Sequence, residues 1–343
     1  MGVTREGYRI AVTGADGRSS GVVETYERVG VEAPVAALVA LARQESDGFA
    51  VVLDSANGIM DAPLASAGIP VLRADPSLLM EDQATAETLA ALGHSRSAGL
   101  TALPPGGWTM SGREDEITAK ETASGPVERQ LAASGLLLNG GSATAPLVAL
   151  TFDDGPHPRY TPQVLDVLAR YAAPATFFCI GLHALAHPAV VRRISAEGHA
   201  LGNHSWSHAY LPDLGPAGLA DQLGFTADAL THAAGGGPRP PRWLRPPYGG
   251  RSPELLHTVA GLGLTTVLWD VDARDWSRPG PEAITERVLS QVRPGSVVLM
   301  HDGGGDRSQT VAALPAVITG LRDRGYRVVG LEELLAARPT VGV

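Results

Sequence analysis

The chain has 343 residues, which exceeds one average domain, so two domains are the first expectation. Lys and Arg total 27 against 36 Asp and Glu, which gives a net charge of -9, and no basic stripe is present that would follow a phosphate backbone. We therefore expect no nucleic-acid partner. The single cysteine cannot form a disulfide within the chain, so the composition does not require an oxidising compartment.

The amino-terminal segment carries charges at Arg5, Glu6 and Arg9 and lacks the apolar stretch of a secretory signal. The longest uncharged stretch, residues 130–152, contains Pro146 and a glycine pair, which favours a linker that runs into a strand over a membrane span. We therefore expect a cytoplasmic protein without a membrane partner.

Residues 1–104 predict a small α/β domain. Apolar runs predict three strands, over residues 8–12, 49–53 and 69–72. A helix is expected after Pro34, because apolar residues recur there at helical spacing, and alternation of strand and helix is typical of a parallel layered module. Residues 105–145 are rich in Pro, Gly and Ser, which predicts a linker with a short helix over 126–133.

Residues 146–338 alternate apolar strand patterns with helical patterns and predict one β/α domain. The predicted strands cover residues 147–152, 175–180, 199–202, 243–245, 265–269, 297–300 and 326–329. The predicted helices cover residues 163–171, 189–197, 217–232, 253–261, 281–291 and 310–324. This order is typical of a closed parallel β/α array, in which the carboxyl ends of the strands carry the chemistry.

Two polar motifs indicate a hydrolytic metal site. In the first, Asp153 and Asp154 precede a Gly-Pro turn at the end of a predicted strand. Adjacent strand residues point to opposite faces, so both carboxylates reach one site only where the backbone turns. The second motif holds His204 and His208, whose spacing lets two imidazoles share one face of a helical turn. Carboxylate and imidazole ligands suit a divalent cation such as Zn²⁺.

These two motifs and three that follow in order resemble those of polysaccharide deacetylases of the NodB-homology type, carbohydrate esterase family four. The further motifs are Arg245–Gly249, Asp272–Trp276 and Leu299–His301. The resemblance covers about residues 145–338. It implies a distorted (β/α)7 barrel, to which residues 1–104 add a small amino-terminal α/β domain.

The resemblance implies that Asp154, His204 and His208 are the metal ligands. Neutral imidazoles and a carboxylate agree with Zn²⁺ as the preferred ion, with Co, Mn or Ni as alternatives. Asp153 is implied to be the general base that takes a proton from the attacking water. Arg245 is implied to hold the Asp153 carboxylate through paired guanidinium donors.

The resemblance also implies that His301 is the general acid, which protonates the departing amine. Asp272 is expected to orient His301 and to raise its pKa; Asp270 ranks second for this role, and Asp275 receives no assignment. The backbone N–H of Tyr248 is the implied donor to the oxyanion.

Trp276 and Leu299 match positions that line the acyl pocket of the family. The histidines outside the motifs have no second partner at a suggestive spacing, and we expect them to be surface or core residues. These are His94, His157, His183, His187, His199, His232 and His257.

The expected function is hydrolysis of the acetamide of an N-acetylated amino sugar such as N-acetylglucosamine, with release of acetate. The missing secretion signal and an aromatic content of 5% favour a soluble glycoside or biosynthetic intermediate. The alternatives are a deacetylase of peptidoglycan or chitin oligomers, a metal-independent amide or formamide hydrolase of the same fold, and a carbohydrate-binding protein with an inactive site. Residues 1–104 could cover the barrel mouth, select the substrate or form a homo-oligomer.

Overall fold

The computed structural model describes most of the chain beyond residue 113 and separate segments before it. The described residues are 2–4, 7–13, 19–27, 36–41, 50–53, 64, 67–74, 100–102, 114–141, 143–236 and 241–338. They divide into two compact units. The amino-terminal unit comprises Met1–Glu121 and Ser205–Phe225, and the β/α unit comprises Thr122–His204 and Thr226–Val343.

The first segments of the amino-terminal unit form two small sheets. In one, β1 (Gly2–Thr4), β2 (Gly7–Thr13) and β3 (Ser19–Glu27) pair antiparallel. In the other, β4 (Val51–Leu53) pairs parallel to β5 (Val71–Ala74), and β6 (Leu100–Ala102) pairs antiparallel to β5. The parallel module predicted here is therefore confirmed only for β4 and β5. Only five residues separate β2 from β3, and a parallel crossover needs a dozen or more.

Helix α4 (Glu114–Ala133) is much longer than the short helix predicted in the linker. Pro126 is typical of a helix start, which is why the sequence pattern places the beginning of the helix there. In the structure Pro126 lies inside α4. The first turn of α4 is acidic, and the positive end of the helix dipole stabilises negative side chains there. Strand β7 (Leu137–Leu138) follows and pairs parallel to β12 (Thr265–Val267), so this part of the predicted linker belongs to the sheet. The boundaries predicted at residues 104 and 145 stay predictions.

A nine-stranded parallel sheet organises the β/α unit. Its strands besides β7 are β8 (Leu147–Asp153), β9 (Thr176–Cys179), β10 (Ala200–Asn203), β11 (Trp243–Leu244), β12 (Thr265–Val267), β13 (Val271–Asp272), β14 (Ser296–His301) and β15 (Arg327–Val328). The strand order is β13-β14-β8-β9-β10-β11-β12-β7, and β15 pairs with β8. The central strand β8 is buried over its whole length.

The parallel β/α architecture predicted from the sequence is confirmed, in the form of a curled sheet. The expected closed array is not formed, since β13 and β7 end the strand order and do not pair with each other among the described residues. Strands β7 and β13 escaped prediction because each has two residues, too few to display an alternating pattern.

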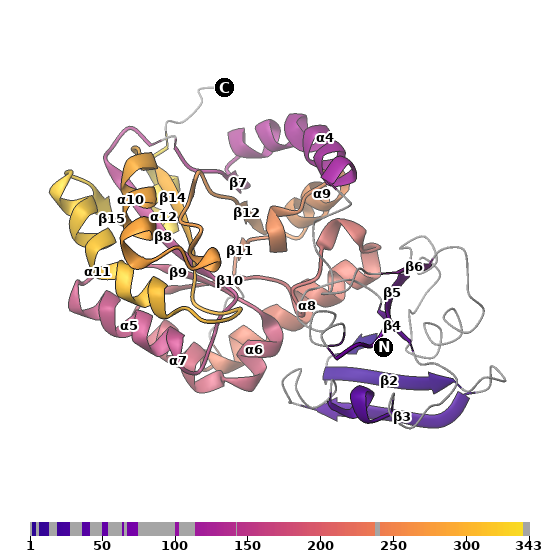
Figure 1. Ribbon diagram of the computed structural model, residues 1–343. Coiled ribbons are helices and arrows are strands. Elements are labelled where there is room, and N and C mark those ends of the chain that lie inside the picture. The colour runs from indigo at the N-terminus through magenta and orange to yellow at the C-terminus, as the bar shows by residue number, and fades with distance from the viewer. Residues whose placement is uncertain are drawn as a thin grey trace. The chain divides into compact units, whose positions relative to one another are not determined.

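Helices on the outer face of the sheet enclose the main core (Figure 1). The helices after α4 are α5 (Tyr160–Arg170), α6 (Gly181–Ala186), α7 (Pro188–Ala196), α8 (Pro216–Ala233), α9 (Pro253–Gly261), α10 (Pro281–Gln291), α11 (Ser308–Asp323) and α12 (Leu331–Ala336). Short 3₁₀ turns are η2 (Leu211–Asp213), η3 (Pro247–Gly249) and η4 (Asp275–Ser277). Helix α11 packs beside α5 and α10, and Phe152 stacks on Phe177 beneath them with ring centroids 5.2 Å apart.

The parallel sheet brings the strand ends to one edge, where β8 ends at Asp153 and β14 ends at His301. His204 directly follows β10, and Arg245 directly follows β11. The predicted motif residues therefore gather at the carboxyl edge of the sheet. Among the helices within the described residues, none is long and apolar enough to cross a membrane.

Candidate active site

The paired carboxylates lie where β8 gives way to a turn. Asp153 is the last strand residue and is buried, while Asp154 adopts a left-handed backbone conformation with φ of 72°. This conformation reverses the usual alternation of side chains, so Asp154 need not point away from the face reached by Asp153. A non-glycine residue held at positive φ is strained, and such residues gather at functional sites. The strand-end turn predicted from the sequence is thus already made at Asp154.

Arg245 is fully buried and holds Asp153 in place. Its Nη1 donates to Asp153 Oδ1 at 2.7 Å and to Thr151 Oγ1 at 2.8 Å. Its Nε and Nη2 donate to backbone carbonyls of β12 and the residue after it, and the guanidinium lies over the Phe178 ring at 4.3 Å. The prediction of paired donors to Asp153 is therefore wrong, because the remaining donors satisfy buried carbonyl groups. Burial lowers the pKa of Arg245, and the negative charge of Asp153 offsets part of this lowering.

Replacing Arg245 with Met is expected to destabilise the fold by about 3–5 kcal/mol, because it leaves the Asp153 carboxylate buried without its cation. The free energy of unfolding in urea measures the loss. Arg242→Met is the matched control, since Arg242 is paired with Glu332 on the surface and both side chains are largely exposed. That exposed pair should contribute less than about 1 kcal/mol. Equal losses in the two variants would contradict the role given to the buried pair.

His204 is buried at the end of β10 and has a fixed tautomer. Its Nδ1 donates to the backbone carbonyl of Arg245 at 2.7 Å. A carbonyl oxygen only accepts, so Nδ1 carries the proton and Nε2 faces the carboxylates, 3.4 Å from Asp154 Oδ1 and 3.7 Å from Asp153 Oδ2. Burial lowers the pKa of His204, but the Asp153 and Asp154 carboxylates outweigh burial and raise it overall.

The segment that carries His208 is not helical, so the predicted helical turn is wrong. Ser205 and His208 both have left-handed backbones, with φ of 64° and 60°. Gln222 of α8 fixes this turn, because its Oε1 accepts from the backbone N–H groups of Trp206 and Ser207. The imidazoles spaced by four converge through this turn instead of through helical periodicity.

The predicted metal ligands do lie together. Asp154, His204 and His208 each offer one ligand atom, and these atoms lie within 4.8 Å of one another. A carboxylate with two imidazoles is a donor set that Zn²⁺ accepts, and three protein ligands leave one coordination position open. The hydrogen bond that fixes the His204 tautomer is of the kind that supports a ligand histidine. The residues present therefore fit a divalent cation.

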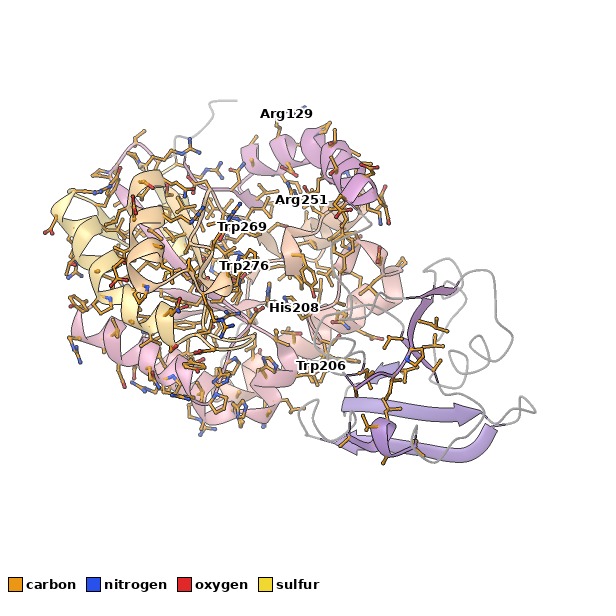
Figure 2. The ribbon with its side chains drawn as sticks, in the orientation of Figure 1. Arg129, Trp206, His208, Arg251, Trp269 and Trp276 are labelled. Atoms are coloured by element: carbon orange, nitrogen blue, oxygen red, sulfur yellow. The ribbon has the colours of Figure 1, made fainter. Side chains whose placement is uncertain are left out.

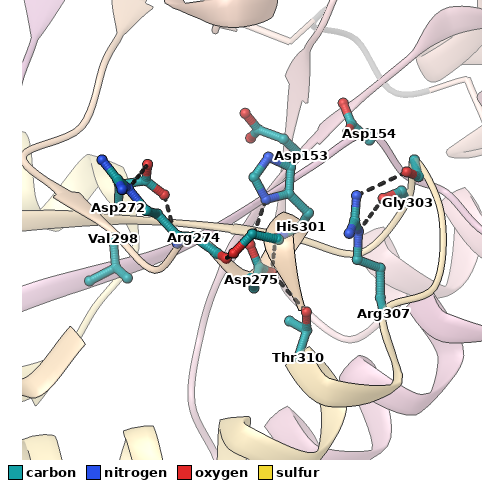
Figure 3. Close-up of polar contacts among 12 residues, drawn as sticks. Asp153, Asp154, Asp272, Arg274, Asp275, Val298, His301, Gly303, Arg307 and Thr310 are labelled. Atoms are coloured by element: carbon teal, nitrogen blue, oxygen red, sulfur yellow. Dashed lines mark hydrogen bonds and ion pairs between the residues drawn. The ribbon is translucent and has the colours of Figure 1, made fainter. Parts of the chain in front are cut away.

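His301 and Asp275 form an ion pair beside β8, on the side of β14. Asp275 is buried, and His301 is partly buried. The Nδ1 atom of His301 donates to Asp275 Oδ1 at 2.7 Å, and the backbone N–H of His301 donates to Asp275 Oδ2 at 2.8 Å. Thr310 completes the set by donating to the same oxygen. Strands β14 and β8 pair so that His301 is level with Asp153, and Asp153 lies on the opposite side of the imidazole ring from Asp275 (Figure 3).

The charge of Asp275 keeps His301 protonated near neutral pH. Burial opposes the imidazolium, yet the Asp275 carboxylate and its hydrogen bond outweigh burial and raise the pKa of His301 to about 9. Asp154 and Asp153 raise it further by smaller amounts. Asp275 itself is almost fully buried, and its pKa is lowered because the interaction with His301 outweighs burial.

The prediction that Asp272 orients His301 is wrong. Asp272 accepts from the backbone N–H of Arg274 at 2.8 Å within its own loop, and Figure 3 shows Asp272 apart from His301. Asp270, which ranked second, accepts from Ser296 Oγ and from the backbone N–H of Val297 at 2.8 Å. The motif contains two aspartates, and its second one, Asp275, makes the contact. The second aspartate of the motif was the signal that the sequence offered, but spacing alone does not tell which of the two aspartates contacts His301.

The residues predicted to contact substrate differ in backbone conformation and in exposure. Tyr248 lies in η3 with a left-handed backbone, φ of 61°. Leu299 is buried on β14, two residues before His301, so both side chains leave the same face of that strand. Trp276 of η4, labelled in Figure 2, is 54% exposed, so about half of this large apolar residue is open to solvent.

Comparisons with known proteins agree with this geometry. A family model described as polysaccharide deacetylase matches residues 140–267. The chain is 46% identical over 200 residues to a chitooligosaccharide deacetylase of Sinorhizobium fredii, a match that covers 55% of this chain and 92% of the relative. It is 41% identical over 191 residues to a peptidoglycan-N-acetylglucosamine deacetylase of Bacillus cereus, covering 55% of this chain and 88% of that protein.

Solved structures also resemble the chain. A peptidoglycan N-acetylglucosamine deacetylase in complex with an N-oxidanyl-benzamide compound matches with a TM-score of 0.57 and 35% identity, over 60% of this chain and 95% of the other. A carbohydrate esterase family four pseudoenzyme from Bacillus anthracis matches with a TM-score of 0.54 and 31% identity, over 58% of this chain and 68% of the other.

A parallel β/α sheet with carboxylates and imidazoles at its carboxyl edge, together with these relatives, defines the chain as a hydrolase of amide carbon–nitrogen bonds. The chain belongs to the polysaccharide deacetylase family, carbohydrate esterase family four.

Proposed function

We propose that the protein is a divalent-metal-dependent N-deacetylase that releases acetate from N-acetylglucosamine units of an oligosaccharide. The observation that carries the proposal is the placement of a base and an acid at neighbouring strand ends, Asp153 on β8 and His301 level with it on β14. Amide hydrolysis needs a proton removed from water and another delivered to the leaving nitrogen. The two groups supply these functions from the two sides of one site.

Asp153 acts as the general base in this proposal. Arg245 fixes one carboxylate oxygen, Oδ1, at 2.7 Å, which leaves Oδ2 as the oxygen that accepts a proton from the attacking water. His301 acts as the general acid, because the Asp275 carboxylate keeps it protonated and orients its ring through Nδ1. The proton for the departing amine then comes from Nε2 of His301.

Asp154, His204 and His208 are proposed to hold the metal, with Zn²⁺ preferred because of the mixed imidazole and carboxylate donors. When bound, a divalent cation polarises the acyl oxygen and makes water easier to deprotonate. Tyr248 is proposed to donate its backbone N–H to the oxyanion. Leu299 is proposed to line the acyl pocket because it shares a strand face with His301, and Trp276 is proposed to border it.

The relatives favour an oligosaccharide or glycan strand over the soluble glycoside that the sequence first suggested. The relatives named above are deacetylases of chitooligosaccharide or of peptidoglycan N-acetylglucosamine. Trp276 is about half exposed and offers a flat ring on which a sugar face can stack, which suits a chain of sugars. A cytoplasmic location and a homo-oligomer formed through residues 1–104 stay predictions.

Removal of metal tests the mechanism. Treatment with a chelator is expected to abolish acetate release from N-acetylated chitooligosaccharides, and added Zn²⁺, Co²⁺ or Mn²⁺ is expected to restore it, because three side chains with no ion cannot polarise the acyl group. Acetate is measured by a coupled assay before chelation, after it and after each metal is returned. Unchanged turnover without metal would favour the metal-independent amide hydrolase instead.

A substrate panel tests the choice of sugar chain. Chitooligosaccharides of increasing length, peptidoglycan fragments and N-acetylglucosamine glycosides are compared by kcat/KM. We expect a higher kcat/KM for the oligosaccharides than for the simple glycosides. If a simple glycoside has a higher kcat/KM than every oligosaccharide, a biosynthetic intermediate becomes the preferred substrate instead.

A further inference from the structure

We propose that His183 and the loop Gly303–Arg307 are positioning elements that lock Asp154 in its left-handed conformation and thereby set how tightly the chain holds its divalent metal. The inference rests on the proposed function insofar as Asp154 is taken as a metal ligand. It adds residues that none of the five motifs contains, and all of them belong to the β/α unit.

His183 contacts the backbone of Asp154. It lies in the first turn of α6, and its Nδ1 is 2.8 Å from the Asp154 carbonyl oxygen. Because the carbonyl only accepts, His183 Nδ1 carries the proton and donates. The neighbouring peptide is tied to the same loop, since the backbone N–H of Ile180 donates to the carbonyl of Gly155 at 2.9 Å. The start of α6 therefore holds the Asp154 turn from one side.

Two glycines hold the turn from the other side. A Cβ at Gly303 would lie 2.1 Å from the Asp154 carbonyl oxygen, so the two backbones pack directly against each other. A Cβ at Gly304 would lie 2.5 Å from Asp154 Oδ2, so this glycine borders the ligand carboxylate itself. Neither position has room for a side chain. The glycines form a wall that limits where the carboxylate can go.

Arg307 fixes this wall. Its side chain is buried, with Nε donating to the Gly303 carbonyl at 2.6 Å and Nη2 donating to the Gly304 carbonyl at 2.9 Å (Figure 3). One rigid guanidinium thus orients both peptide groups that face Asp154. Gly304 has φ of 70°, a conformation that a larger residue rarely adopts.

This arrangement explains how a strained ligand stays in place. A non-glycine residue at positive φ persists only where its surroundings determine it, and here a histidine donor and a guanidinium-braced glycine wall do so. Groups that orient a metal ligand typically change metal affinity or activity by 10- to 100-fold when they are removed. His183 was expected to be an ordinary surface or core histidine, and the contact that distinguishes it is formed only by the fold.

The first experiment compares His183→Leu with His183→Asn by competition for Zn²⁺ against a chromophoric chelator. The amide nitrogen of Asn takes the place of Nδ1 and keeps a donor, whereas Leu removes it. We expect the Leu variant to raise the Zn²⁺ dissociation constant by about 10- to 100-fold and the Asn variant to stay close to the parent. His257→Leu, at an exposed position on α9, is the control. If the Asn variant binds Zn²⁺ as weakly as the Leu variant, the hydrogen-bond donor does not determine the Zn²⁺ affinity and the proposal is overturned.

The second experiment uses Gly304→Ala, which pushes on the Asp154 carboxylate. Gly263→Ala is matched to it, because Gly263 has φ of 74° and its Cβ would meet nothing within 4 Å. Both variants carry the same backbone strain, so weaker Zn²⁺ binding in Gly304→Ala alone supports the proposal. Thermal unfolding of each variant confirms the fold. Equal Zn²⁺ affinities in the two variants would contradict the proposal that Gly304 restricts the Asp154 carboxylate.

These measurements need no substrate, which separates the inference from the proposed function. The predicted ranking of Zn²⁺ affinities together with no acetate release would remove the deacetylase proposal and leave the positioning role intact. Acetate release that depends on metal, together with equal Zn²⁺ affinities in every variant, would remove the positioning role alone.

Discussion

Asp153→Asn is expected to lower kcat by about 10²- to 10⁴-fold, the range that a general base contributes. The amide oxygen of Asn can still accept the 2.7 Å hydrogen bond from Arg245 Nη1, so the side chain keeps its place and loses only its ability to take a proton. The measurement is acetate release from a chitooligosaccharide at saturating substrate and metal.

Asp154→Asn is the matched variant for this prediction, because it changes the adjacent carboxylate in the same way. It is expected to weaken Zn²⁺ binding, since Asp154 belongs to the ligand set, whereas Asp153→Asn is expected to retain bound Zn²⁺. Zinc content after gel filtration distinguishes the two. Full turnover in Asp153→Asn, with Zn²⁺ bound, would assign the base to another residue.

Asp275→Asn is expected to lower kcat by about 10²-fold or more at neutral pH, because removing the group that orients a catalytic histidine disables the proton transfer. The change also removes the main cause that raises the pKa of His301 to about 9. The acid must be protonated to act, so activity is present below the pKa of His301 and lost as pH rises through it. The basic limb of the rate profile should therefore move to lower pH in the variant.

A bound cation offsets part of the Asp153 and Asp154 charge that also raises the pKa of His301, so the basic limb of the parent should lie at or below about pH 9. Asp272→Asn is the control, since Asp272 contacts only its own loop and Asn still accepts from the Arg274 N–H. We expect its kcat profile against pH to match the parent. If the basic limb of the rate profile moves in Asp272→Asn and does not move in Asp275→Asn, the residue that orients His301 is Asp272, as the sequence predicted.

Local patterns predicted the framework well because they report periodicity. Strand and helix patterns located seven of the nine strands of the parallel sheet, and boundaries of α9 and α10 agree with the structure. The failures have physical causes. Two-residue strands show no alternation, and Pro126 lies within α4 although it is typical of a helix start.

The candidate site was only partly visible in the sequence. Each motif places its residues just past a strand, and parallel strands bring those positions to one edge, so Asp153, His204 and His301 could be predicted to meet. The backbone conformations could not. Asp154, His208 and Tyr248 all have positive φ, which residues other than glycine adopt only when the surrounding fold enforces it.

The sequence by itself determined the parallel β/α fold, the family and the chemical groups of the site, because periodicity and motif order are local properties of the chain. Only the tertiary structure decided which groups touch. Asp275 reaches His301 because left-handed turns at Arg274 and Arg278 flank η4, and the contact joins residues 26 positions apart. His183, Gly303 and Gly304 meet the Asp154 turn across still larger separations. Spacing along a chain does not rank such contacts, since they depend on how loops from different strands pack at one edge.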